Sequence, residues 1–174
     1  LNTVITYDGK AHTLAAENLP EGVWAAYEVS QSDGYQDNTQ TEPGIYHILA
    51  HFWFIDDNDA KNYEPIPDRT AWLTIEKIVY DMSGVEFADE TVTYDGAVHT
   101  ISVAGELPQG VSVQYFGETS AVGKHEITAR FTVEDPAHYA EIPDKKATLT
   151  VEKAGLTVEF IGNLNVTYDG EPHK

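Results

Sequence analysis

The sequence VITYDGKAH at residues 4–12 returns as TVTYDGAVH at residues 91–99 and as NVTYDGEPH at residues 165–173. Each copy places a Tyr-Asp-Gly triplet after residues that favour β-structure. Asp-Gly suits tight hairpin turns, because such turns need positive φ and glycine adopts it freely. The triplet therefore predicts a strand followed by a hairpin turn, and its recurrence predicts a fold built from repeats.

The repetition extends well beyond this motif. LPEGVWAAYE matches LPQGVSVQYF, PGIYHILAHFWF matches VGKHEITARFTV, and NYEPIPDRTAWLTIEK matches HYAEIPDKKATLTVEK. We therefore divide the chain into repeat 1 (residues 1–77), repeat 2 (78–153) and the start of repeat 3 (154–174). The extra length of repeat 1 is an insertion near residues 28–42.

A strand-like stretch precedes the YDG strand in two of the copies. It reads GVEFAD in repeat 2 and LTVEF in repeat 3, whereas only six residues precede Tyr7. We therefore expect repeat 1 to lack its first strand, repeat 2 to be complete and repeat 3 to be truncated. Because a lone strand and hairpin is marginally stable in water, we expect residues 154–174 to pair with an exposed edge by strand exchange between chains.

The fold class predicted from these patterns is all-β. HEITARFTV and KATLTVEK alternate apolar and polar residues, which is typical of strands with one buried face. Repeats of this length, with short strands and turn residues between them, indicate tandem small immunoglobulin-like β-sandwiches. A β-grasp-like sheet is the alternative, and it would need a helix for which no helical periodicity is present.

Composition excludes several classes of function. The chain has 29 acidic and 10 basic residues and a net charge of -19, so its surface repels nucleic acid and anionic membranes. No apolar run is long enough to cross a bilayer. The absence of cysteine excludes disulfides, thiolate metal sites and cysteine nucleophiles.

The ordered motifs VTYDGxxHT, LPxGVxVxY, GxYxITAxF and NYxxIPDxxATLTIEK resemble the YDG/MBG-type tandem repeats of bacterial cell-surface, adhesin-like proteins. The resemblance spans residues 1–174. It implies extracellular, cell-wall-associated display and a stalk, spacer or adhesive role. The family brings no catalytic residues to this sequence, and repeat 1 departs from its pattern by its insertion and its tryptophans.

No catalytic, cofactor-binding or metal-binding set is apparent, and we expect a protein that is not an enzyme. The histidines of the YDG motif, His12, His99 and His173, come one to a copy, which favours structural hydrogen bonding beside the turn over metal binding. DDNDAKN at residues 56–62 offers oxygen ligands for calcium, but its spacing is not that of an EF-hand. We expect it to be a solvated acidic loop.

All three tryptophans of the chain lie in repeat 1. Trp24, Trp53 and Trp72 align with Ser112, Thr132 and Thr148 of repeat 2, each of which alternates with apolar neighbours. Since neighbours in a strand point to opposite faces, the tryptophans are predicted to point outward. The same alternation places Leu49 on the outward face.

The outward aromatic face is our candidate ligand-binding site, with Tyr35 of the insertion as a further member. Exposed aromatic patches commonly mark contacts with sugars or proteins, so the candidate partners are a host glycan, a mucin or an extracellular protein. The competing interpretation is that the insertion folds across the sheet and covers the tryptophans. The two are compatible, because a loop above an aromatic floor forms a pocket.

Overall fold

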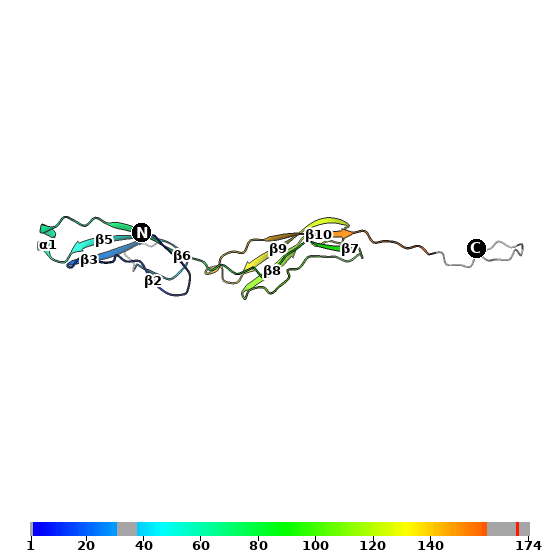
Figure 1. The fold of residues 1–174 in the computed structure, drawn as a ribbon, viewed down its shortest axis with the longest axis horizontal. Coiled ribbons are helices and arrows are strands. Elements are labelled where there is room, and N and C mark those ends of the chain that lie inside the picture. The colour runs from blue at the N-terminus through cyan, green and yellow to red at the C-terminus, as the bar shows by residue number, and fades with distance from the viewer. Residues whose placement is uncertain (1, 31–37, 160–169, 171–174) are drawn as a thin grey trace.

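The computed structural model describes residues 2–30, 38–159 and 170, and it shows an all-β chain with two four-stranded sheets. Figure 1 shows the two sheets following one another along the long axis of the molecule, with residues 154–159 leading away from the second.

The first sheet has the strand order β1-β6-β5-β3. Its strands are β1 (Asn2–Thr6), β6 (Arg69–Glu76), β5 (Gly44–Phe54) and β3 (Val23–Ser30). β1 runs parallel to β6, and the other neighbours are antiparallel. A separate two-stranded sheet joins β2 (His12–Thr13) to β4 (Thr39–Gln40).

The second sheet has the order β7-β10-β9-β8, with the same pattern of parallel and antiparallel neighbours. Its strands are β7 (Glu90–Thr93), β10 (Lys145–Glu152), β9 (Gly123–Val133) and β8 (Val111–Phe116). Apolar and polar residues alternate along β9 and β10, and in the middle of each strand every second side chain is buried. This alternation gives the sheet one buried and one exposed face. Ile127 and Leu149 are fully buried at its centre.

The inner face of the second sheet is covered by extended chain rather than by a second continuous sheet. Val85 is buried against Phe131 and Ile142, and a bridge joins Glu86 to Ala104. These segments lie opposite the sheet and close the core. The first sheet has its own core cluster of Val29, Ile48, Leu73 and Ile75.

A partly buried tyrosine hydroxyl accepts an equivalent backbone hydrogen bond on the inner side of each sheet. The Tyr27 hydroxyl accepts a hydrogen bond from the Ala16 amide at 2.9 Å, and the Tyr115 hydroxyl accepts one from the Val103 amide at 3.0 Å. Both pairs are partly buried, where an unsatisfied amide is costly. The matching sequence motifs thus correspond to matching contacts.

The prediction that YDG forms a hairpin turn is wrong. β1 pairs with β6 and β2 pairs with β4, so the turn carries the chain from one sheet to another. Its geometry comes from the aspartate: Asp8 Oδ1 accepts from the Lys10 amide at 3.0 Å and lies 2.8 Å from His12 Nε2. Gly9 supplies the positive φ, at 73°.

The same turn recurs at Asp95. Its Oδ1 accepts from the Ala97 amide at 2.8 Å and lies 2.9 Å from His99 Nε2. The expectation of structural histidines is therefore confirmed for His12 and His99. His173 lies outside the described residues.

The acidic segment after β5 is helical rather than a loop. Helix α1 (Asp57–Asn62) begins with a 3.1 Å hydrogen bond from the Ala60 amide to the Asp56 carbonyl. Lys61 lies in its last turn, where a positive charge suits the helix dipole. Among the described residues, this short helix is the only one, so the sheet lacks the packed helix of a β-grasp.

Leu149→Ala is expected to lower the free energy of unfolding of the second sheet by about 2–5 kcal/mol, because it leaves a cavity at a fully buried position. Thr132→Ala, on the exposed face of β9, is the control and is expected to change stability by less than about 0.5 kcal/mol. Urea unfolding followed by circular dichroism measures both, while tryptophan fluorescence reports on the first sheet alone. Equal effects of the two variants would contradict this core assignment.

Candidate functional site

One residue separates the backbone hydrogen bonds of the first sheet from those of the second unit, which comprises the second sheet and the segments packed on it. β6 ends at Glu76, whose carbonyl accepts a hydrogen bond from the Tyr7 amide at 2.8 Å. Ile78 already belongs to the second unit: its amide donates to the His138 carbonyl at 2.9 Å, and its carbonyl accepts from the Ala140 amide at 2.8 Å. Only Lys77 lies between these two sets of backbone bonds.

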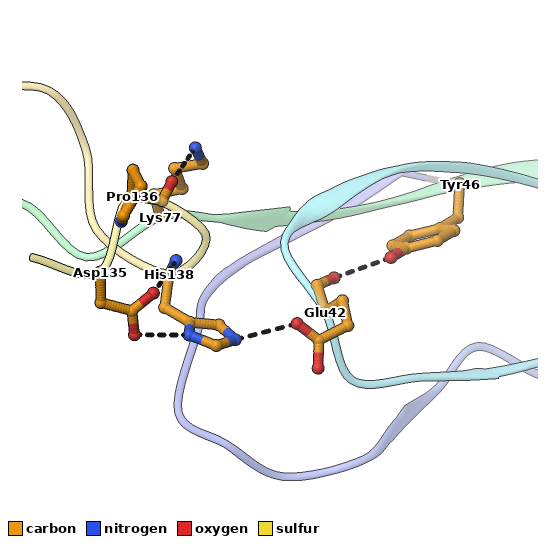
Figure 2. Close-up of polar contacts among 6 residues, drawn as sticks. All are labelled: Glu42, Tyr46, Lys77, Asp135, Pro136 and His138. Carbon is orange, nitrogen blue, oxygen red and sulfur yellow. Dashed lines mark hydrogen bonds and ion pairs between the residues drawn. The ribbon is translucent and has the colours of Figure 1, made fainter.

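Side chains reinforce this connection, and Figure 2 shows them. The Lys77 ammonium donates to the Pro136 carbonyl at 2.6 Å. His138 lies between two carboxylates: Nδ1 is 2.7 Å from Asp135 Oδ2, and Nε2 is 2.9 Å from Glu42 Oε2. Because Glu42 precedes β5 of the first sheet, the His138–Glu42 contact joins the two units.

Two tyrosines complete this junction. The ring of Tyr7, from the first YDG motif, stacks on the His138 imidazole with centroids 4.3 Å apart and planes 17° apart. The Tyr46 hydroxyl donates to the Glu42 carbonyl at 2.8 Å and so fixes the backbone of the residue that pairs with His138. We call Tyr7, Glu42, Lys77, Asp135 and His138 the junction cluster.

The carboxylates around His138 favour its charged form. Hydrogen bonds that the ring donates to Asp135 and, to a smaller extent, to Glu42 raise the pKa of the imidazole above its ordinary value of 6.5. In return, the hydrogen bond to His138 lowers the pKa of Asp135. Burial, together with Glu42 and Asp135, raises the pKa of the Tyr7 hydroxyl. The cluster therefore places the imidazole between two carboxylates and against an aromatic ring, an arrangement that favours the charged imidazolium.

The predicted aromatic face lies on the outer side of the first sheet, away from its core. Trp24, Trp53 and Trp72 are 50%, 40% and 45% exposed. Trp24 and Trp53 are direct partners across β3 and β5, and their rings stack with centroids 4.9 Å apart. The outward orientation inferred from alternation is therefore confirmed for all three tryptophans.

The sheet separates these tryptophans into two groups. Trp72 pairs with His47 across β6 and β5, with ring centroids 4.6 Å apart. His47 and Trp53 are six residues apart on β5, which places the two groups about 20 Å apart at about 3.4 Å per residue. Leu49 lies between them on β5, half-buried and paired with Glu28 and Thr70.

Polar groups interrupt the aromatic face. His51 Nδ1 lies 2.9 Å from Asp68 Oδ2, and its ring centroid lies 5.8 Å from that of Trp53. Nε2 of His51 is buried, 3.5 Å from Glu28 Oε1, and makes no hydrogen bond within the described residues. Hydrogen-bonding groups thus lie directly beside the stacked tryptophans.

The insertion is described only in part. Tyr35 lies outside the described residues, as do the other residues from 31 to 37. Thr39 and Gln40 of β4 pair with β2 instead of crossing the outer face of the first sheet.

The second sheet has a polar face where the first has its tryptophans. Ser112 and Thr132 stand at the positions of Trp24 and Trp53 and border a shallow hollow. Nearby, Lys146 pairs with Glu126 at 2.7 Å, and the Arg130 guanidinium lies over the Phe116 ring. The aromatic face is therefore particular to the first sheet.

The part of the chain that the structure describes shows neither a metal cluster nor a membrane-spanning helix. No group of three or more His, Cys, Asp or Glu side chains in that part of the chain is arranged to hold a metal ion. Over the same residues, no helix has the length and apolar character needed to cross a membrane.

The junction cluster could not be found by sequence reasoning. Glu42 belongs to the insertion, and repeat comparison aligns His138 with Asn62, so neither residue recurs. The two are 96 residues apart in the sequence. The recurring tyrosine of the YDG motif is the one signal that the sequence offers, and its pattern predicts a turn rather than a contact between units.

Comparisons with known proteins do not assign a family. No family model matches the chain, and no curated protein matches it. The chain is similar to a solved structure described as Drosophila OTK, extracellular domains 3-5, with 13% identity and a TM-score of 0.24. The likeness covers 87% of this chain and 62% of that one, and at this distance it says nothing further about fold or function.

The junction is expected to be tightest in mildly acidic solution. Because the pKa of His138 is raised in the folded chain, its stabilisation is complete below pH 6.5 and is lost as the pH rises through the folded value. The pKa of Asp135 is lowered from 3.8, so its stabilisation is present above that pH and is lost as the pH falls through the folded value. NMR relaxation should show the two sheets tumbling together at mildly acidic pH and more independently in alkaline solution.

Glu42→Gln should lower the His138 pKa measured by NMR titration, because it removes one of the two carboxylates that stabilise the imidazolium. Glu64→Gln, which makes the same charge change beside α1 at the far end of the first sheet, is the control. A His138 pKa that responds equally to both variants would refute the role of Glu42.

Proposed function

We propose that this chain is a non-catalytic stalk or spacer segment of a bacterial cell-surface adhesin, built from tandem immunoglobulin-like repeats. The proposed units are residues 1–77 and 78–153, followed by the start of a third at 154–174. The observation that carries the proposal is the junction: two sheets of the same strand order follow one another, and only Lys77 lies between the last strand of the first sheet and Ile78, which is bonded to the β9–β10 connection of the second unit.

A spacer must hold its units apart, and the contacts at the junction restrain how the two units can move relative to one another. The Tyr7–His138 stack, the Glu42–His138 pair and the Lys77–Pro136 bond all restrain the angle between the sheets. The parallel pairing of each YDG strand with the last strand of its sheet supports the immunoglobulin-like assignment. The net charge of -19 opposes collapse of one unit on another, since like charges repel.

The resemblance of the repeated motifs to YDG/MBG-type repeats supports extracellular display. The absence of cysteine is compatible with that location in bacteria, where surface proteins commonly lack disulfides.

Small-angle X-ray scattering tests the spacer role. A compact chain of this length would have a radius of gyration of about 16 Å, and we expect a clearly larger value. A value near the compact one would contradict the role. Antibodies raised against the chain should also label intact source cells, and labelling that requires cell lysis would contradict surface display.

A second candidate function is ligand binding on the aromatic face of the first sheet. Tryptophan rings stack on the apolar faces of sugars, and carboxylates such as Glu28 and Asp68 accept hydrogen bonds from hydroxyl groups. The spacing of about 20 Å between the two aromatic groups suits an extended ligand lying along β5. The acidic charge favours a neutral glycan over a sulfated or sialylated one.

The double variant Trp24→Ala/Trp72→Ala is expected to weaken binding of a neutral glycan at least about tenfold, because it removes one ring from each end of the face. A glycan array followed by calorimetry measures the effect. Phe116→Ala, an exposed aromatic on the outer face of the second sheet, is the control. Unchanged binding by the double variant, with its fold intact, would exclude this site.

A further inference from the structure

The second unit holds an arginine in a defined setting on the outer face of its sheet. Arg130 Nε lies 3.4 Å from Asp144 Oδ2, and the central carbon of the guanidinium lies 5.0 Å from the centre of the Phe116 ring. Arg130 projects from β9, Phe116 from the neighbouring strand β8, and Asp144 directly precedes β10. A carboxylate on one side and an aromatic ring on the other therefore hold this cation.

The first unit repeats this setting with a histidine in place of the arginine. The repeat match and the strand registers give three equivalent pairs: His51 and Arg130, Asp68 and Asp144, and Glu28 and Phe116. His51 Nδ1 lies 2.9 Å from Asp68 Oδ2, and Nε2 lies 3.5 Å from Glu28 Oε1. The imidazole thus has a carboxylate on each side, whereas the arginine has only one.

The two carboxylates of the first unit are not matched by a permanent cation. Within the described ranges, the only ion-pair partner of Glu28 and Asp68 is His51, and an imidazole carries a charge only when it is protonated. Asp68 occupies the Nδ1 side of the ring, and Nε2 makes no hydrogen bond within those ranges. The Glu28 side chain is 42% exposed, so it is the carboxylate left open to a ligand.

The tryptophans add aromatic surface beside these carboxylates. Trp53 lies two residues beyond His51 on the same face of β5, with ring centroids 5.8 Å apart, and Trp24 stacks on Trp53. Aromatic faces attract cations, and a guanidinium can stack on such a face while it donates hydrogen bonds to a carboxylate. The second unit has Ser112 and Thr132 in place of these tryptophans, so the extra aromatic surface belongs to the unit that lacks the arginine.

We propose that the outer face of the first sheet binds an arginine side chain from a basic segment of a partner protein, where the second unit holds its own Arg130. The guanidinium stacks on the exposed Trp24–Trp53 pair and donates to Glu28. Glu28 and Trp53 both adjoin the His51 ring, so one guanidinium beside that ring meets both. The net charge of -19 attracts a basic partner. The proposal goes beyond the spacer role and does not depend on glycan binding.

Titration with a glycine-flanked arginine peptide (acetyl-GRG-amide), followed by NMR, tests the proposal. All three tryptophans lie in the first unit, so their indole N–H signals report on this unit alone. The signals of Trp24 and Trp53 should shift, and that of Trp72, in the other aromatic group, should not. A peptide with citrulline in place of arginine keeps the shape without the charge, and it should bind at least about fivefold more weakly.

Variants of the chain test the role of each carboxylate and of the histidine. His51→Arg gives the first unit the cation that the second already has, so it should weaken peptide binding at least about fivefold without disturbing the fold. Glu28→Gln removes the open carboxylate and should weaken binding at least about threefold. Glu90→Gln, the same charge change at the exposed start of β7, is the control and should bind like wild type.

Three results overturn the proposal. The first is a wild-type chain whose Trp24 and Trp53 signals do not respond to the peptide, or respond equally to the citrulline peptide. The second is binding that survives His51→Arg. The third is equal weakening by Glu28→Gln and Glu90→Gln, because net charge alone would then cause the attraction. Neutral-glycan binding should survive Glu28→Gln, whose amide still accepts hydrogen bonds, so failure of the arginine site and failure of the glycan site are separate results.

Discussion

The parallel pairing of each YDG strand with the last strand of its own sheet is the constraint on which the rest depends. In the first sheet it aligns Thr6 with Glu76 and brings the Tyr7 amide to the Glu76 carbonyl. Tyr7 therefore stands where the chain leaves the sheet, beside Lys77, and its ring meets His138. A hairpin at the same motif would have left the tyrosine away from the connection.

The same sheet gives the first unit two different faces. Alternation along β5 sends Trp53 and Leu49 outward, and Ile48 and Ala50 inward. The outward side chains form the aromatic face, and the inward ones line a hollow on the opposite side of the sheet. The candidate binding surface and the core of the unit therefore lie on opposite faces of one sheet.

The charge pairing between His138 and Glu42 at the junction contributes only modestly to holding the two units together. The His138 side chain is 26% exposed, and Glu42 is 65% exposed, so solvent screens their pairing and its contribution is modest. Stacking on Tyr7 and the backbone bonds of Ile78 do not depend on that charge. Protonation thus adjusts how tightly the units are held, while the backbone connection persists.

Local pattern in the sequence determined the all-β class, the strands and the outward direction of the tryptophans, because side-chain alternation is a property of neighbouring residues. It did not determine which strands pair, so the YDG motif predicts a hairpin that the structure does not form. The short helix α1 has no apolar periodicity by which a local pattern could indicate it. Only the tertiary structure brought Tyr7, Glu42 and His138 together. These contacts join residues far apart in the sequence and do not recur between the copies, so no local pattern records them.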